Sequence, residues 1–152
     1  MTLREGLVRY YERNAAVFSR RELSPQAQEF FRCHDVAHVV FGCDTSLFGE
    51  GIVKIFTIFG TTLGLRGHLA GYAEAGAFSL FGRYGIAHVL RNVPRLCASA
   101  PRAIARTRRM TRPWPWADHD VHLDRPLEAI RREFNIEPLA RRTVATTAAI
   151  HR

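Results

Sequence analysis

The chain has 152 residues, of which 47% are hydrophobic and 24% are charged, and its net charge is +8. This length and composition are typical of one globular domain with a buried core, and they exclude an extensively disordered chain. The positive charge comes almost entirely from arginine, since Lys54 is the single lysine, and such a surface suits phosphate groups, acidic lipid head groups or nucleic acid.

The first part of the chain predicts two helices. From Leu3 to Phe18, apolar residues recur near helical spacing with arginine and glutamate between them. The pair Ser24-Pro25 predicts the start of a second helix, because serine is a good N-cap and proline suits the first helical position. We expect this second helix to run to about Gly42 or Asp44.

The middle of the chain predicts further helices and no membrane span. A third helix is expected over about Leu47–Leu65, and one or two more between Gly67 and Arg109, with Pro94 and Pro101 as breaks or kinks. The most apolar run, residues 52–65, is shorter than the roughly 20 residues that a bilayer requires. We therefore expect a soluble or peripheral protein.

The last part of the chain combines a loop with one more helix. Residues 112–120 are rich in tryptophan and proline, and a final helix is expected from about Arg125 to Phe134, with Asp124 as its cap and Pro126 in its first turn. The tail after Pro138 is expected to be loose. Strand signals are almost absent, so we predict a single-domain, all-α helical bundle over residues 1–152.

Three polar residues lie on the apolar side of the predicted second helix. At about 100° per residue, His34, Asp35 and His38 share one third of the helix circumference, together with apolar residues such as Phe31 and Phe41. Burying a carboxylate there is costly unless it is paired or binds a metal. The spacing therefore indicates a buried polar site.

Glu50 follows His38 by twelve residues, across a segment rich in turn and cap residues. A short turn between helices would bring Glu50 close to His38. Imidazole with carboxylate suits Zn²⁺, Fe²⁺ or Mn²⁺, and the sequence does not select among them. The alternatives are a hydrogen-bonded histidine pair in the core, a solvent-exposed Glu50–Lys54 pair, and Asp35 as a residue that orients a histidine.

These residues resemble the signature of a known family. The stretch HDVAHVVFGCDTSLFGE contains HDxxH, eleven residues and then glutamate, as His34, Asp35, His38 and Glu50. This is the signature of the ubiquinone (coenzyme Q) biosynthesis protein 4 family. The final LEAIRREFNIEP is similar to the LRxELGIxP-type ending of that family, so the resemblance extends over most of the chain.

The resemblance implies an all-helical protein that binds a divalent metal (Zn, Fe, Mn or Mg) through His34, Asp35, His38 and Glu50, which would also be its catalytic residues. It implies a polyprenyl lipid or prenylated quinone precursor in an apolar tunnel beside the metal, association with a membrane surface, and oxidative decarboxylation at ring carbon C1 as the candidate reaction. It also implies other quinone-biosynthesis proteins as partners, and we expect a homodimer.

Two further features bear on the ligand. Ten of the eleven glycines lie between Gly42 and Gly85, which indicates either tight helix packing or a slot for an elongated apolar ligand. The arginine-rich run of residues 95–112 contains no acid, which is typical of a solvated helix face or a dock for anionic lipid heads. It lacks the aromatic residues of nucleic-acid stacking platforms, so we expect no nucleic acid.

The cysteines and the first residues bear on location. An odd number of cysteines without a CxxC pair indicates a reducing compartment, and the beginning of the chain lacks the apolar region of a secretory signal. We expect a bacterial protein, peripheral on the inner face of the cytoplasmic membrane. The leading hypothesis is a metal-dependent protein of ubiquinone synthesis; the alternative is a non-catalytic prenyl-lipid-binding or scaffold protein with a structural or head-group-binding metal.

Overall fold

In the computed structural model, residues 1–15, 24–74 and 86–139 are described, and they form six α-helices and one short 3-10 helix. Within these ranges there is no strand, and only two isolated bridges occur, Thr2–Pro126 and Thr61–Trp114. The prediction of an all-α fold is confirmed for this part of the chain.

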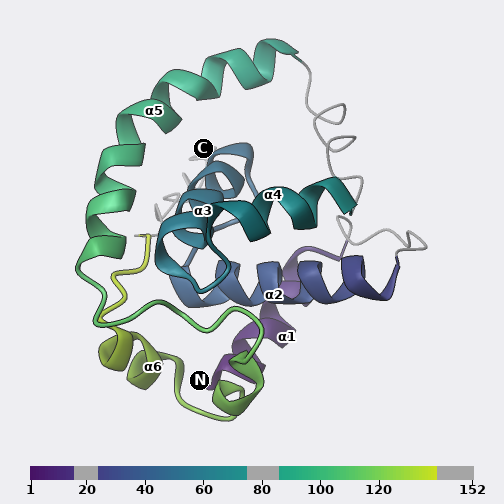
Figure 1. Cartoon of the computed structure of the whole chain (residues 1–152), viewed down its shortest axis with the longest axis vertical. Helices are drawn as coiled ribbons and strands as arrows, with labels where there is room; N and C mark the ends of the chain where they lie inside the picture. Colours follow the sequence, from purple (N-terminus) through teal and green to yellow (C-terminus); the bar gives the residue numbers. More distant parts are fainter. Residues whose placement is uncertain (16–23, 75–85, 140–152) are drawn as a thin grey trace, which may run out of the picture.

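The two helices at the centre of the molecule are α2 and α3, and the other helices surround them (Figure 1). Helix α1 packs on α2, α5 runs along α3, and α4 contacts both α2 and α3. The short η2 and α6 lie beside the beginning of α1. The bounds are α1 Leu3–Arg13, α2 Pro25–Phe41, α3 Leu47–Gly60, α4 Gly64–Glu74, α5 Ile86–Arg108, η2 His119–His122 and α6 Leu127–Phe134.

Helix α2 is capped as the sequence predicts. The Ser24 hydroxyl accepts a hydrogen bond from the Ala27 N–H, Pro25 takes the first helical position, and Gly42 ends the helix in the left-handed conformation with φ of 68°. The guanidinium of Arg131, on α6, donates to the carbonyls of Val39 and Val40 at 2.9 Å. Because the last carbonyls of a helix have no partner within it, these bonds fix the end of α2.

Helix α1 is shorter than the apolar pattern predicts. It ends at Arg13 and not at Phe18, because the Asn14 N–H bonds to the carbonyls of Tyr10 and Tyr11 and the Asn14 side chain also donates to Tyr10. Residues 16–23 lie outside the described ranges. At its other end, Thr2 and Glu5 form a capping box.

The predicted third helix is interrupted after Gly60. Thr61 is extended, the Trp114 N–H donates to the carbonyl of Gly60 at 2.8 Å, and the Thr62 N–H donates to the carbonyl of Trp114 at 2.9 Å. Trp114 therefore forms hydrogen bonds with backbone groups of Gly60 and Thr62 that would pair within the helix if it continued. The chain restarts as α4 at Gly64, so the prediction of one helix to Leu65 is wrong.

Helix α5 runs through both Pro94 and Pro101 as one helix. It packs closely on α3, because a Cβ added at Gly51 or Gly60 would lie within 3.0 Å of Leu96 or Thr107. Tight helix packing thus accounts for Gly60, whereas the atoms that face Gly51 are the flexible end of Leu96. The glycines at 76, 82 and 85 lie outside the described ranges.

Helix α6 begins at Leu127, two residues later than predicted. Asp124 is not its cap, since its carboxylate pairs with the Arg4 guanidinium at 2.7 Å. Trp114 and Trp116 are buried. The rings of Trp114 and Phe134 meet edge to face, with their centroids 5.1 Å apart. The tryptophan-rich loop therefore belongs to the core. The predicted loose tail falls largely on residues 140–152, outside the described ranges.

None of the helices described here combines the length and the apolar character that crossing a membrane would require.

Candidate metal centre

The two histidines of the HDxxH motif lie on one face of α2, one helical turn apart. His34 is 5% exposed and His38 is 1% exposed, and their rings meet edge to face with centroids 4.8 Å apart. The i,i+4 spacing alone places the two rings on the same side of the helix. The face that the sequence marks as apolar is therefore the face that buries both imidazoles.

A tight turn brings Glu50 back to this face. Gly42 reverses the chain, and Ser46 caps α3 by accepting a hydrogen bond from the Gly49 N–H. A Cβ at Gly49 would lie 2.2 Å from the carbonyl oxygen of Asp44, so only glycine fits this turn. Glu50 then stands in the first turn of α3, directed at α2.

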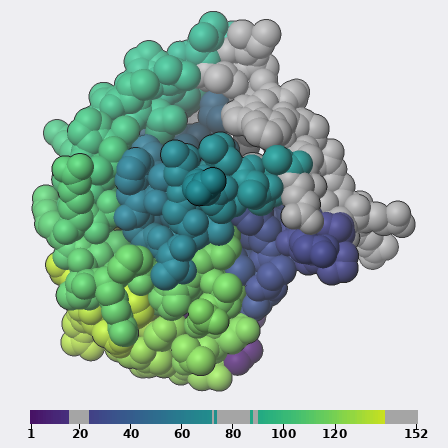
Figure 2. Space-filling view, in the orientation of Figure 1, coloured from purple at the N-terminus to yellow at the C-terminus, as the bar shows by residue number. Residues whose placement is uncertain are grey.

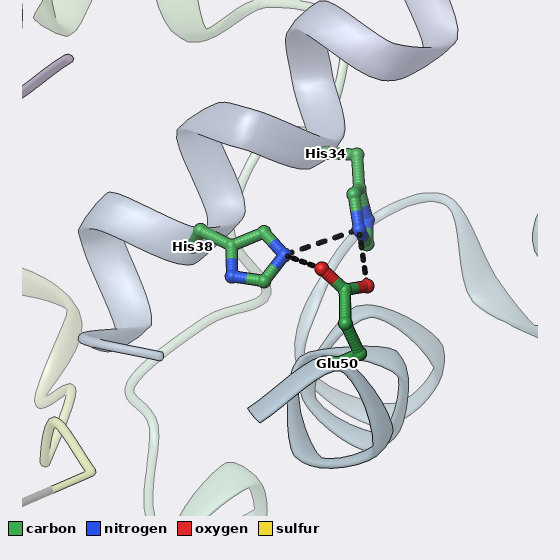
Figure 3. A group of neighbouring side chains, drawn as sticks. All are labelled: His34, His38 and Glu50. Atoms are coloured by element: carbon green, nitrogen blue, oxygen red, sulfur yellow. Dashed lines mark hydrogen bonds and ion pairs between the residues drawn. The ribbon is translucent and has the colours of Figure 1, made fainter. Parts of the chain in front are cut away.

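The three side chains converge on one point, as Figure 3 shows. The Nε2 atoms of His34 and His38 are 3.2 Å apart. Each is also close to the Glu50 carboxylate, at 3.3 Å from Oε2 for His34 and 3.1 Å from Oε1 for His38. This is the one group of three or more metal-ligating side chains within the described ranges.

The tautomer of His38 suits metal binding. Its Nδ1 lies 3.3 Å from the carbonyl oxygen of Cys43. Because a carbonyl only accepts, this contact places the proton on Nδ1 and leaves the lone pair of the neutral ring on Nε2, which faces the centre of the group. Backbone carbonyls commonly orient metal-binding histidines in this way.

The spacing of the three groups fits a divalent ion. The nearest atoms of the three side chains are 3.1–3.3 Å apart, with a different Glu50 oxygen facing each histidine, and one ligand atom from each residue lies within 4.8 Å of the others. Two imidazoles and one carboxylate form a ligand set that zinc, iron and manganese accept. The residues present therefore fit such an ion and leave further coordination positions open.

The electrostatics of the group agree with this fit. Burial disfavours the charged form of Glu50, but the two imidazoles hold the pKa of this carboxyl well below its usual range. Burial lowers the pKa of His34. An ionised carboxylate beside a histidine that resists protonation is the state in which these groups bind metals.

Asp35 takes a different direction from the two histidines. It is buried, and its carboxyl forms hydrogen bonds with Tyr10 and Tyr11 of α1. Burial raises its pKa to about 7. The ring of Tyr10 stacks on His38 with centroids 5.4 Å apart. Asp35 is thus outside the converging group, and its predicted role as a fourth ligand stays a prediction.

Residues 21–140 match the family described as coenzyme Q (ubiquinone) biosynthesis protein Coq4. The chain belongs to the Coq4 family. The resemblance seen in the HDxxH and glutamate motif is therefore confirmed, and membership places the chain in coenzyme Q biosynthesis. No curated protein and no solved structure matched the chain significantly.

The open alternative for Glu50 can now be compared with the structure. The Glu50 side chain is 25% exposed and lies against the imidazoles, so it is not a member of a solvent-exposed Glu50–Lys54 pair. His119 and His122 are buried and join no metal-binding group within the described ranges.

Sequence reasoning assigned no role at the site to two residues beside the Coq4 motif. Lys54 lies one turn after Glu50 on α3, and His68 is buried on α4. Both interact electrostatically with His34. The i,i+4 spacing from Glu50 was a signal for Lys54, whereas His68 depends on the packing of α4, which no local pattern shows.

Proposed function

We propose that this Coq4 family protein is a divalent-metal-dependent protein that binds a prenylated ring precursor of coenzyme Q. The observation that supports this most is the convergence of His34, His38 and Glu50 within 3.1–3.3 Å of one another. Structural metal sites usually fill four positions with protein ligands, whereas catalytic sites keep one open. Three converging ligands favour a site with an open position.

The candidate reaction is oxidative decarboxylation of the prenylated ring acid. The ring loses its carboxyl carbon as CO₂ and gains one oxygen atom, a two-electron oxidation that requires an external oxidant such as molecular oxygen. A bound divalent ion would hold the ring carboxylate or phenolate and activate oxygen or water. The chain itself would hold the ion through the two imidazoles and Glu50, and Tyr10 would keep His38 in place by stacking.

The prenyl tail, we infer, lies along the helices that surround the site. Apolar side chains on these helices are exposed, which is typical of binding surfaces when they gather in patches. They are Phe59 on α3, Leu65 and Leu69 on α4, and Leu90 and Val93 on α5. The predicted apolar tunnel would be completed by these helices.

The same helices support a peripheral position on the inner face of a bacterial cytoplasmic membrane. Helices α4 and α5 lie on the face shown in Figure 2. Exposed arginines accompany the exposed apolar residues: Arg66 between Leu65 and Leu69, and Arg91 and Arg95 near Val93. Leucine side chains with arginines beside them suit an anionic bilayer surface, where each basic residue contributes about 1 kcal/mol.

The experiment that tests the proposed metal centre measures metal content. Purified protein would be analysed by inductively coupled plasma mass spectrometry, with His34→Ala and Glu50→Ala beside it and Glu12→Ala as the control. Glu12 is an exposed glutamate of α1. We expect about one metal per chain in the wild type and in the control, and loss in both site variants.

The identity of the ion and the presence of turnover would then separate the two hypotheses. Iron or manganese would support oxygen chemistry, and zinc or magnesium would support Lewis-acid or head-group binding. A loaded protein that binds prenylated 4-hydroxybenzoate without releasing CO₂ would support the lipid-binding or scaffold alternative. No metal in the wild type, even after soaking with these ions, would contradict the proposed metal centre and leave a polar core network.

A further inference from the structure

The last turn of α2 carries His38 and is followed by the turn that leads to α3. The Nδ1 atom of His38 lies 3.3 Å from the carbonyl oxygen of Cys43, which is five residues further along the chain. Cys43 comes directly after Gly42, and the N–H groups of both residues donate to the carbonyl of His38. The direction of the Cys43 carbonyl, and with it the tautomer of His38, therefore depends on how the chain leaves this helix.

The other carbonyls of this last turn are bound by residues from near the other end of the sequence. The Arg131 guanidinium donates from Nε to the carbonyl of Val40 and from Nη2 to that of Val39, both at 2.9 Å. The Leu139 N–H donates to the carbonyl of Phe41, also at 2.9 Å. Because carbonyls at the end of a helix have no partner within it, α6 and the residues that follow it fix the backbone from which the turn starts.

Arg131 is itself held in one orientation. Its side chain is 14% exposed, and its third nitrogen, Nη1, donates to the Glu128 carboxylate at 2.9 Å. A guanidinium is planar and carries its donors in a fixed fork, so it can bind two neighbouring carbonyls at once, and its positive charge is favourable at the C-terminal end of a helix. A lysine ammonium would bring the charge without the fork.

The same segment packs against the turn itself. Gly42 is left-handed, with φ of 68°. A Cβ added at Gly42 would lie 2.9 Å from the Cβ of Pro138 and 3.6 Å from the Nη2 atom of Arg131. The chain reversal that presents Cys43 to His38 is therefore enclosed by the segment to which Arg131 belongs.

We propose that Arg131 is a positioning residue of the metal centre. By fixing the last carbonyls of α2, it keeps the Cys43 carbonyl against Nδ1 of His38, and this contact keeps the lone pair of the neutral ring on Nε2, where the proposed ion binds. The inference rests on the proposed metal centre and extends it, because Arg131 is not a ligand and yet sets the state of one. A purely structural Arg131 would stabilise the folded protein without affecting that tautomer.

Nuclear magnetic resonance of the metal-free protein with isotope-labelled histidine offers a direct test, because correlations between ring protons and ring nitrogens distinguish the two tautomers. The spectra would be recorded at about pH 8, where histidine side chains are ordinarily neutral, and a His38→Gln sample would identify the His38 signals. Wild type would be compared with Arg131→Met and Arg131→Lys. Arg132→Met, which removes an exposed cation from the same helix, is the matched control. Competition with a fluorescent chelator would give the Co²⁺ affinity of each protein.

We expect the ring proton of His38 on Nδ1 in wild type and in Arg132→Met, and a shift of the proton toward Nε2 in Arg131→Met. Co²⁺ binding by Arg131→Met should be about tenfold to hundredfold weaker, the usual effect of losing a group that orients a ligand. Arg131→Lys should recover only part of this loss, because an ammonium cannot bind both carbonyls in the same way. Glu128→Gln, which removes an exposed partner of the guanidinium, should give a smaller shift in the same direction and keeps the test valid if Arg131→Met does not fold.

Urea denaturation of the same variants separates positioning from stability. A loss of stability in Arg131→Met and Glu128→Gln, with the His38 tautomer and the Co²⁺ affinity unchanged, would overturn this inference alone and leave Arg131 as a structural residue. A wild-type protein that binds no Co²⁺ would overturn the metal centre, and the positioning role with it.

Discussion

The Nε2 atoms of His34 and His38 lie 3.2 Å apart with their ring planes at 89°, and both nitrogens face the Glu50 carboxylate. A histidine pair that merely shares a hydrogen bond in the core needs one proton and no third group. Here a carboxylate on a different helix completes the group at the same distance. This relationship favours an ion at the centre and leads to the first prediction.

Asp35→Asn and Glu50→Gln should differ in their effect on metal binding. Glu50 contacts both imidazoles, whereas the Asp35 carboxyl is bonded to Tyr10 and Tyr11. We expect Asp35→Asn to lower metal affinity about 10- to 100-fold, the usual cost of losing a residue that orients a ligand. Glu50→Gln should lower it further. Competition against a fluorescent chelator measures both dissociation constants.

Asp44→Asn is the control for this comparison, because Asp44 is an exposed carboxylate in the turn before α3. A Tyr10→Phe variant, which removes one donor to Asp35 but keeps the stacked ring, should show a weaker form of the Asp35→Asn effect. If Asp35→Asn abolished metal binding as completely as Glu50→Gln, Asp35 would be a direct ligand, as the family motif implies.

Because α4 packs closely on α2, adding a single methyl group at Gly71 should destabilise the fold. A Cβ at Gly71 would lie 2.2 Å from ring atoms of Phe30, which is itself buried. Gly71→Ala should therefore lower the free energy of unfolding by on the order of 1–3 kcal/mol. Urea denaturation followed by circular dichroism gives this value.

Gly51→Ala is the matched control, since it is also a helical glycine at a helix contact. Its new Cβ would meet the flexible end of Leu96 at 2.7 Å, which can rotate away, and alanine gains about 1 kcal/mol in helix propensity. We expect Gly51→Ala to be close to neutral. Equal destabilisation by the two variants would mean that α4 does not pack on Phe30 as described.

Protonation of His122 should contribute to the loss of stability of the fold at acidic pH. It is buried beside Trp114, its Nδ1 accepts a hydrogen bond from Arg125 at 3.0 Å, and burial followed by the Arg125 charge lowers its pKa below the usual 6.5. The unfolded chain therefore binds more protons than the folded protein below about pH 6.5, and the free energy of unfolding falls as the pH decreases through this window.

His122→Gln should reduce this pH dependence. The variant loses ring packing and is less stable at neutral pH, but its free energy of unfolding should fall less between about pH 7 and pH 5, because no buried imidazole has to be protonated. Urea denaturation at several pH values measures the slope for both proteins. Parallel slopes would show that His122 has no part in the acid response.

The sequence predicts best where a local rule decides the structure. Ser24, Pro25 and Gly42 define α2 through capping alone, and the spacing of His34 and His38 places two imidazoles on one face. Glu50 could be added because the turn residues between the helices leave few ways to connect them. The polar group of the candidate site was therefore predictable from neighbouring residues.

Long-range contacts decide the rest. The break after Gly60 depends on Trp114, which is 54 residues away, and takes backbone hydrogen bonds that no local pattern reveals. The partners of Asp35 lie on α1, and the burial of His68 depends on how α4 packs. Helix spacing alone left open whether Asp35 binds the metal or orients a histidine, because partners on another helix are not visible in it; the ligand role came from the family resemblance and stays a prediction.

The exposed leucines of α4 predict binding to anionic membranes. Leu65 and Leu69 are each more than half exposed, with Arg66 between them. The double variant Leu65→Ser/Leu69→Ser should bind vesicles of phosphatidylglycerol and phosphatidylcholine at least about tenfold more weakly, because fully burying one leucine side chain in the bilayer contributes about 1.5–3 kcal/mol.

Arg91→Gln/Arg95→Gln should weaken binding mainly at low salt, where attraction between basic residues and anionic lipids is least screened. Val121→Ser, a change at an exposed apolar residue of η2, is the control and should leave sedimentation with the vesicles unchanged. Equal binding of the leucine variant and the wild type, or equal binding to vesicles without phosphatidylglycerol, would exclude this face of α4 and α5 as the membrane contact.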